Sequence, residues 1–108
     1  MVRLRLPFGM VHHTTVVSRK TPLDGRLELA AGLATLLGRF DGSLEVSYRG
    51  VTDSATLEQM ACSCAKGDGA GHVHHFLRSE LLRSLPPEAT AHLSVDLDGG
   101  WIGIDAEP

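Results

Sequence analysis

Hydrophobic and polar residues alternate near both ends of the chain, which is the pattern of strands with one buried face. Residues 2–6 place valine or leucine at every second position, with arginines between them. Residues 11–18 are rich in β-branched side chains, which favour strands. Residues 93–104 alternate on either side of Asp98-Gly99, a dipeptide typical of hairpin turns. The pattern therefore predicts a pair of strands at each end of the chain.

The middle of the chain shows apolar residues at helical spacing instead. Leucines recur three and four positions apart within residues 26–39, which predicts a helix there. We expect a second helix to begin at Asp53 or Ser54, both good N-caps, and to end near position 66. A third helix is expected over residues 72–85, where the two prolines that follow would terminate it.

Residues 43–49 alternate again and predict a strand between the first two helices. The expected order of elements is β-β-α-β-α-α-β-β. This order predicts an α+β fold, a two-layer and mostly antiparallel sheet with about three helices on one face. A chain of 108 residues has the length of one domain, so we assign residues 1–108 to a single domain.

The composition is that of an ordinary globular protein, with 43% hydrophobic and 21% charged residues. The apolar stretches are too short or too interrupted by charge to span a bilayer, and no apolar block follows the N-terminal arginines as in a secretory signal. We therefore expect a cytoplasmic protein with no membrane partner. Abundant glycine, alanine, leucine and arginine, without any asparagine, are typical of a bacterial gene of high GC content.

Charge is distributed unevenly along the chain, whose net charge is −3. Residues 1–26 hold five arginines and lysines against one aspartate, whereas residues 86–108 hold five acidic residues and no arginine or lysine. A nucleic-acid-binding protein needs a concentrated basic face, so we expect no nucleic-acid partner. The asymmetry instead predicts that terminal strands of opposite charge lie side by side.

A cluster of potential metal ligands lies in the second half of the chain. The candidate ligands are Cys62, Cys64, His72, His74 and His75. Thiolates and imidazoles are the ligands that zinc and copper prefer, so a zinc ion is the cofactor that this cluster would hold. Residues two apart on a helix point about 200° away from each other, so both cysteines reach one ion only if the helix ends first. Otherwise Cys64 is a buried thiol on the apolar face of the helix.

A glycine-rich loop separates the two halves of this cluster. Gly67, Gly69 and Gly71 precede the third expected helix, and free N–H groups at a helix N-terminus attract anions. These glycines are therefore candidate anion-binding residues. Against this, Asp68 would repel an anion, and neither the Walker spacing nor the dinucleotide fingerprint is present. The alternative is a simple connection between helices.

The other histidines raise the possibility of acid–base chemistry, because the pKa of histidine lies near physiological pH. Such a site would require His92 to meet His12 or His13 in a cleft, although histidines in adjacent positions of a strand face opposite sides of the sheet. No motif marks a nucleophile, so no catalytic residue is assigned. Trp101 is expected to anchor the last hairpin in the core or, if exposed, to mark a protein interface.

Residues 23–68 resemble the histidine-containing phosphocarrier protein of the bacterial sugar phosphotransferase system. The matching residues are Leu23-Asp24-Gly25-Arg26, Phe40-Asp41, Ser54 and Lys66-Gly67-Asp68. In this chain Asp24 stands where the family has its phosphorylated histidine, and Leu27 stands where the family has a proline. The resemblance therefore implies a relative that kept a docking surface without the phosphoryl-transfer activity.

The leading hypothesis is a small bacterial binding or regulatory module that acts through protein–protein contacts. Both ends of the chain are expected to be strands, and strands at sheet edges pair readily with a protein partner or a second copy. A dimeric or complex-bound protein follows from this hypothesis. The alternatives are a zinc- or copper-binding protein that uses the cysteine and histidine cluster, and a small enzyme with histidine acid–base chemistry.

Overall fold

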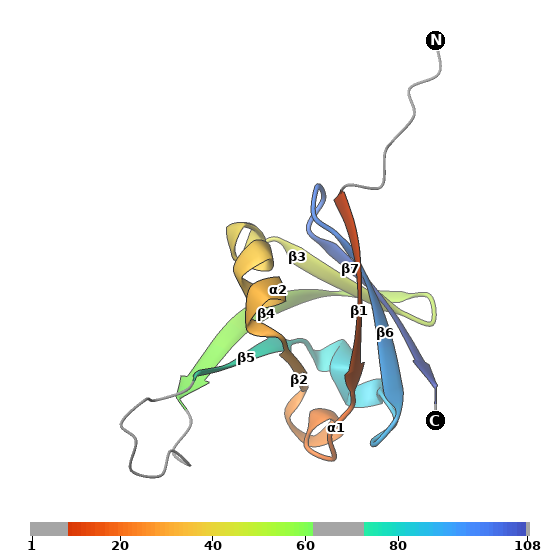
Figure 1. The fold of residues 1–108 in the computed structure, drawn as a ribbon. Coiled ribbons are helices and arrows are strands. Elements are labelled where there is room, and N and C mark those ends of the chain that lie inside the picture. Colours follow the sequence, from red (N-terminus) through yellow and green to blue (C-terminus); the bar gives the residue numbers. More distant parts are fainter. Residues whose placement is uncertain (1–8, 62–72, 108) are drawn as a thin grey trace.

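A computed structural model describes residues 9–61 and 73–107 of the chain (Figure 1). Seven strands make up most of the fold. They are β1 (Met10–Val16), β2 (Arg26–Leu29), β3 (Leu44–Tyr48), β4 (Val51–Ala61), β5 (Val73–Arg78), β6 (Thr90–Asp96) and β7 (Trp101–Glu107). The helical segments are α1 (Thr21–Asp24), α2 (Ala31–Leu37) and the 3-10 turns η2 (Gly38–Phe40) and η3 (Glu80–Ser84).

The strands form one sheet in the order β1-β6-β7-β3-β4-β5-β2, which curls into a nearly closed barrel (Figure 1). All neighbouring strands are antiparallel except β3 and β7, which run parallel. The expected two-layer α+β fold with three helices is therefore wrong. In the described part of the chain only α2 has the length of two helical turns, and it lies beside the sheet near one end of the barrel.

The core fills the inside of the curled sheet with aliphatic side chains. Every second residue of β6 and β7 is buried, and the remaining residues of these strands are at least partly exposed. The largest fully buried side chains include Leu27, Leu37, Leu44, Leu77, Leu82, Leu85, Leu93, Ile102, Val17, Val46 and Val95. Burying such side chains stabilises the fold by about 1.5–3 kcal/mol each, before the entropy cost of ordering the chain is counted.

The helix expected over residues 26–39 divides into a strand and a shorter helix. Gly25 ends α1 with a left-handed backbone conformation (φ 70°) and turns the chain into β2. Within β2, Leu27 and Leu29 are buried while Glu28 is exposed, as the two-residue period of a strand requires. Leucines four apart fit a helix, but Leu29 and Leu33 here belong to consecutive elements that face the same core.

The second and third expected helices are also strands. The chain reverses after β3 at Arg49 and Gly50, whose φ angles of 52° and 81° are both positive, as in a type I′ hairpin turn. β4 therefore pairs directly with β3. Residues 73–78 form β5 rather than the start of a helix. Of the expected third helix, only the short 3-10 turn η3 is helical.

Asp53, expected as one of two possible caps of the second helix, lies in β4 and supports Ser79, the N-cap residue of η3. Its carboxylate accepts hydrogen bonds from the Ser79 hydroxyl at 2.8 Å and from the Leu81 backbone N–H at 3.3 Å. The Ser79 bond is the main reason that the pKa of Asp53 lies below its usual value. The expectation that Asp53 or Ser54 begins a helix is therefore wrong, because both residues lie within a strand.

The expected strands near the two ends of the chain are confirmed within the described residues. β1 pairs with β6 along its whole length, and Arg19 and Glu88 beside this pair form an ion pair at 3.3 Å. β1 itself carries no charged residue, so the expected pairing of terminal strands of opposite charge stays a prediction. The last strand, β7, was expected at an edge of the sheet, but it lies between β6 and β3. The expected strand over residues 2–6 falls outside the described residues.

Within the part of the chain that the structure describes, no helix has the length and apolar character needed to cross a membrane.

Candidate functional site

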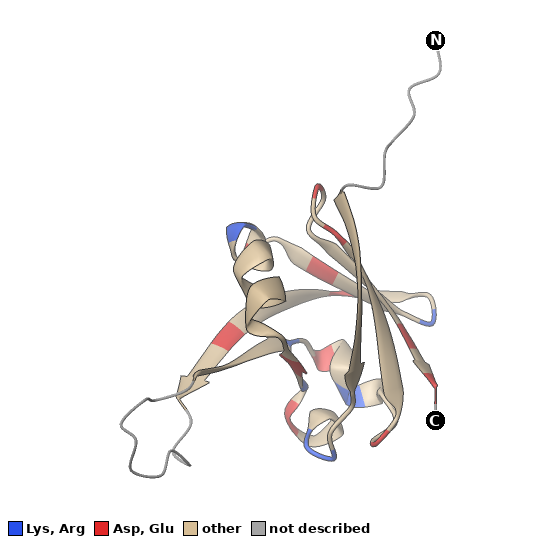
Figure 2. Cartoon of the chain, in the orientation of Figure 1, with Lys and Arg blue, Asp and Glu red and all other residues tan. Residues whose placement is uncertain are grey.

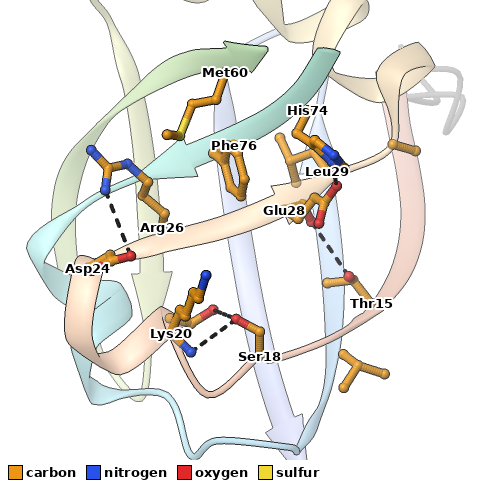
Figure 3. Close-up of a pocket in the computed structure, with 13 residues that line it drawn as sticks. Thr15, Ser18, Lys20, Asp24, Arg26, Glu28, Leu29, Met60, His74 and Phe76 are labelled. Carbon is orange, nitrogen blue, oxygen red and sulfur yellow. Dashed lines mark hydrogen bonds and ion pairs between the residues drawn. The ribbon is translucent and has the colours of Figure 1, made fainter. Parts of the chain in front are cut away.

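A groove separates the two ends of the curled sheet. Among the described strands, β1 pairs only with β6 and β2 pairs only with β5, so each of them has one edge without a strand partner. The space between them measures about 640 Å³ and is lined from β1, α1, β2, β4 and β5 (Figure 3). We call it the β1–β2 groove.

The floor of the β1–β2 groove is apolar. Phe76 of β5 and Met60 of β4 lie on the outer face of the sheet, where the register places Phe76 beside Glu28 and Met60 beside His74. Met60 is 48% exposed, and Phe76 is partly buried. Large apolar side chains on an outward face bury little surface in the fold itself, so they are available to a partner.

A network of ion pairs holds one wall of the groove. Arg26 Nε contacts Glu58 Oε1 at 2.5 Å, and Arg78 Nη1 contacts Glu58 Oε2 at 3.1 Å. The Arg26 hydrogen bond is the main reason that the pKa of Glu58 is lowered, and the same bond raises the pKa of Arg26. Asp24 lies 3.9 Å from Arg26 and extends the network toward α1. One carboxylate between two guanidinium groups fixes the arrangement of β2, β4 and β5 on this side.

A second contact joins β2 to β5, and a weaker one joins β2 to β1. Glu28 Oε2 lies 2.6 Å from His74 Nδ1, and both side chains line the groove (Figure 3). The Thr15 hydroxyl of β1 donates to the backbone carbonyl of Glu28 at 3.5 Å. A side-chain bond of this length stands where a closed barrel would have a ladder of backbone bonds, so the groove is the incomplete closure of the barrel.

The opposite wall comes from the segment between β1 and β2. The Ser18 side chain accepts a hydrogen bond from the Lys20 backbone N–H at 3.2 Å and lies 3.4 Å from the Thr21 hydroxyl. Thr21 is buried, so this wall is packed rather than loose. Gly25 is required below it, because a Cβ there would approach the Ser79 carbonyl oxygen to 2.9 Å.

The structure separates the expected metal ligands that it describes. His74 and His75 are consecutive residues of β5 and therefore point to opposite faces of the sheet. His74 faces the β1–β2 groove, while His75 lines a different hollow beside α2. No cluster of three potential metal ligands occurs within residues 9–61 and 73–107. The remaining candidates lie outside the described residues, namely Cys62, Cys64, His72 and the glycines Gly67, Gly69 and Gly71. The metal and anion sites stay predictions.

The histidines of the acid–base hypothesis lie on β1 and β6. His92 is directly opposite Thr14 in the register, and its ring nitrogens lie 3.4 Å from the Thr14 hydroxyl and 3.1 Å from Glu107 Oε2. His12 lies 3.4 Å from the Ser94 hydroxyl on the same exposed face, whereas His13 is partly buried. Among the described residues, His92 thus contacts a threonine and a glutamate rather than a second histidine.

Sequence reasoning missed the residues that build the groove. Arg26, Glu28 and Phe76 fall in segments that were expected to be helices, so their common outward face on neighbouring strands was not predicted. The signal that could have found them is the short alternation in residues 26–29, where arginine and glutamate alternate with two leucines. Read as a strand, this segment places both charges on one outward face.

Comparisons with known proteins add no relative, since no family model, curated protein or solved structure matches this chain. The resemblance of residues 23–68 to the phosphocarrier family therefore stays a prediction.

Proposed function

We propose that this protein is a binding module that holds an extended segment of a partner protein in the β1–β2 groove. The single observation that carries the proposal is the incomplete closure of the barrel, which leaves two strand edges facing a groove of about 640 Å³. The proposal keeps the expected protein–protein function. It moves the contact from the two chain ends to β1 and β2.

The backbone supports an extended partner. A strand edge presents unpaired N–H and C=O groups, and an added strand satisfies them regardless of its side chains. Natural proteins protect exposed edges with charged residues, proline or bulges. β1 has none of these protections, because its seven residues include neither a charged residue nor a proline (Figure 2). An unprotected edge of this length is a suitable template for a partner strand.

The side chains support a polypeptide rather than a highly charged ligand. The groove is lined by two basic residues, Lys20 and Arg26, and by two acidic residues, Asp24 and Glu28. This balance gives no net attraction for a phosphate-rich or polycationic ligand. Phe76 and Met60 supply an apolar floor for one side chain of the partner. Because ion pairs already fix the side chains of one groove wall, binding would cost little additional conformational entropy there.

The proposal is tested by selecting ligands from a displayed library of random extended peptides on the full chain. The best peptides are then measured against Phe76→Ala and against Val51→Ala, a matched control whose side chain is 56% exposed on the β3–β4 hairpin. We expect Phe76→Ala to weaken binding by roughly 30-fold, as for a central aromatic contact, and Val51→Ala to leave it unchanged. Peptides that bind both variants equally well would contradict the proposal.

A further inference from the structure

A second candidate site lies on the outer face of the sheet, on β7 and its two neighbours. Trp101, the one tryptophan of the chain, lies across Gly103 two residues further along the strand. A Cβ added at Gly103 would meet three carbons of the six-membered indole ring at 2.8 to 3.3 Å. Trp101 remains 37% exposed, so it is not the core anchor of the hairpin that the sequence predicted.

Polar side chains surround this indole in two rows set by the strand register. In the first row, Ser94 of β6 and Ser47 of β3 flank Gly103. In the second row, Asp105 of β7 lies opposite His92 of β6. Arg49 completes the lining from the end of β3. Together with Trp101 these residues border a shallow hollow of about 370 Å³.

Two charged groups in this hollow keep unused hydrogen-bonding capacity. Among the described residues, the Asp105 carboxylate forms no hydrogen bond or ion pair. The Arg49 guanidinium lies 5.3 Å from the centre of the Tyr48 ring and pairs with no described carboxylate. The carboxylate can accept hydrogen bonds and the guanidinium can donate them. A ligand between them would therefore need both a donor and an acceptor group.

We propose that this hollow binds a neutral sugar ring. A hydroxyl group both donates and accepts hydrogen bonds, so adjacent hydroxyls can donate to Asp105 and accept from Arg49. The apolar C–H face of the ring would stack on the Trp101 indole. The acidic residues of the same face, Asp105 and Glu107, disfavour a nucleic-acid strand. A hollow of 370 Å³ is near the lower limit of ligand sites and fits one small ring.

The single tryptophan makes the test direct, because its fluorescence reports on the proposed site alone. The full chain is titrated with a panel of glucose, galactose, mannose and N-acetylglucosamine while Trp101 emission is recorded. We expect at least one sugar to change the emission saturably with a Kd of about 1 mM, the affinity of a small ligand held by a few contacts.

Two variants and one control assign the response to the hollow. Asp105→Ala removes the carboxylate, and Arg49→Asn removes the guanidinium while keeping a residue that accepts positive φ in a type I′ turn. Each variant should weaken binding by roughly 10-fold or more. The control is Asp98→Ala, which removes one carboxylate from the turn between β6 and β7 and should leave sugar binding unchanged. Circular dichroism of each variant checks that it is folded.

Absence of a saturable response to every sugar of the panel would overturn the proposal. A response that survives both variants would also overturn it, because the sugar would then bind elsewhere. Self-association of the protein that Trp101→Ala abolishes would overturn it as well, by assigning this face to a protein interface.

Discussion

The two halves of the barrel wall differ in how they are built. Every second residue of β6, β7 and β3 is buried, whereas β1 alternates between exposed and partly buried residues. β4, β5 and β2 bury fewer side chains, place Phe76 and Met60 outward, and are joined by the ion pairs of Glu58. We call them the core half and the groove half. The core half therefore holds most of the buried side chains, and the groove half carries most of the surface to which we assign the proposed function.

Removing a side chain from each half gives the largest expected contrast. Leu93 of the core half is 1% exposed, whereas Leu57 of the groove half is only partly buried against the core. Leu93→Ala should lower the free energy of unfolding by about 3 kcal/mol, because it leaves a cavity in a packed interior. Leu57→Ala should lower it by roughly 1 kcal/mol. Urea unfolding of both variants measures the difference, and equal losses would show that the halves contribute alike.

A glycine pair tests the wall of the groove half. Gly25→Ala must place an alanine at φ 70° and a Cβ 2.9 Å from the Ser79 carbonyl, whereas Gly42→Ala at φ 97° meets no atom within 4 Å. Both variants place an alanine at positive φ, which costs about 1 kcal/mol or more, and only Gly25→Ala adds the steric contact. Thermal unfolding should show the larger loss for Gly25→Ala. The same melting temperature for both variants would show that the turn before β2 relaxes to accommodate the added Cβ without loss of stability.

The smallest expected effect concerns pH. The folded-state pKa of Glu58 is lowered, mainly by Arg26, and that of Asp53 is lowered, mainly by Ser79. Their contribution to stability is therefore present above the unfolded pKa of about 4 and is lost as the pH falls through the lower folded values. Glu58→Gln should cost roughly 1 kcal/mol or less at neutral pH, because the pair is partly exposed, and should flatten the acid side of the stability profile. An unchanged profile would show that the ion pairs do not contribute.

The sequence predicted the core half well and the groove half poorly, for one physical reason. Burial on a single face leaves a clean alternation, as in residues 93–97, and alternation identifies a strand. In β5, Phe76 faces outward next to the inward Leu77, so the period of two disappears and the apolar stripe resembles a helix. The outward apolar residues that make the groove a candidate site are thus the ones that concealed its strands.

The fold class was predicted wrongly because turns, as well as strands, were not recognised in the sequence. A strand reading of β4 depended on recognising Arg49-Gly50 as a hairpin turn, although the usual dipeptides are Asn-Gly and Asp-Gly. The closure of the barrel depends on the parallel pairing of β3 with β7, which joins residues 56 positions apart in the chain. Local sequence patterns carry no information on such a pairing.

Residue-resolved hydrogen exchange of the full chain tests the central claim most directly. If the barrel is open between β1 and β2, the amides of β1 that point away from β6 should exchange rapidly, while those bonded to β6 are protected. A selected peptide in the β1–β2 groove should then protect the rapidly exchanging set. Slow exchange of both sets in the free protein would show a closed barrel and would contradict the proposed function.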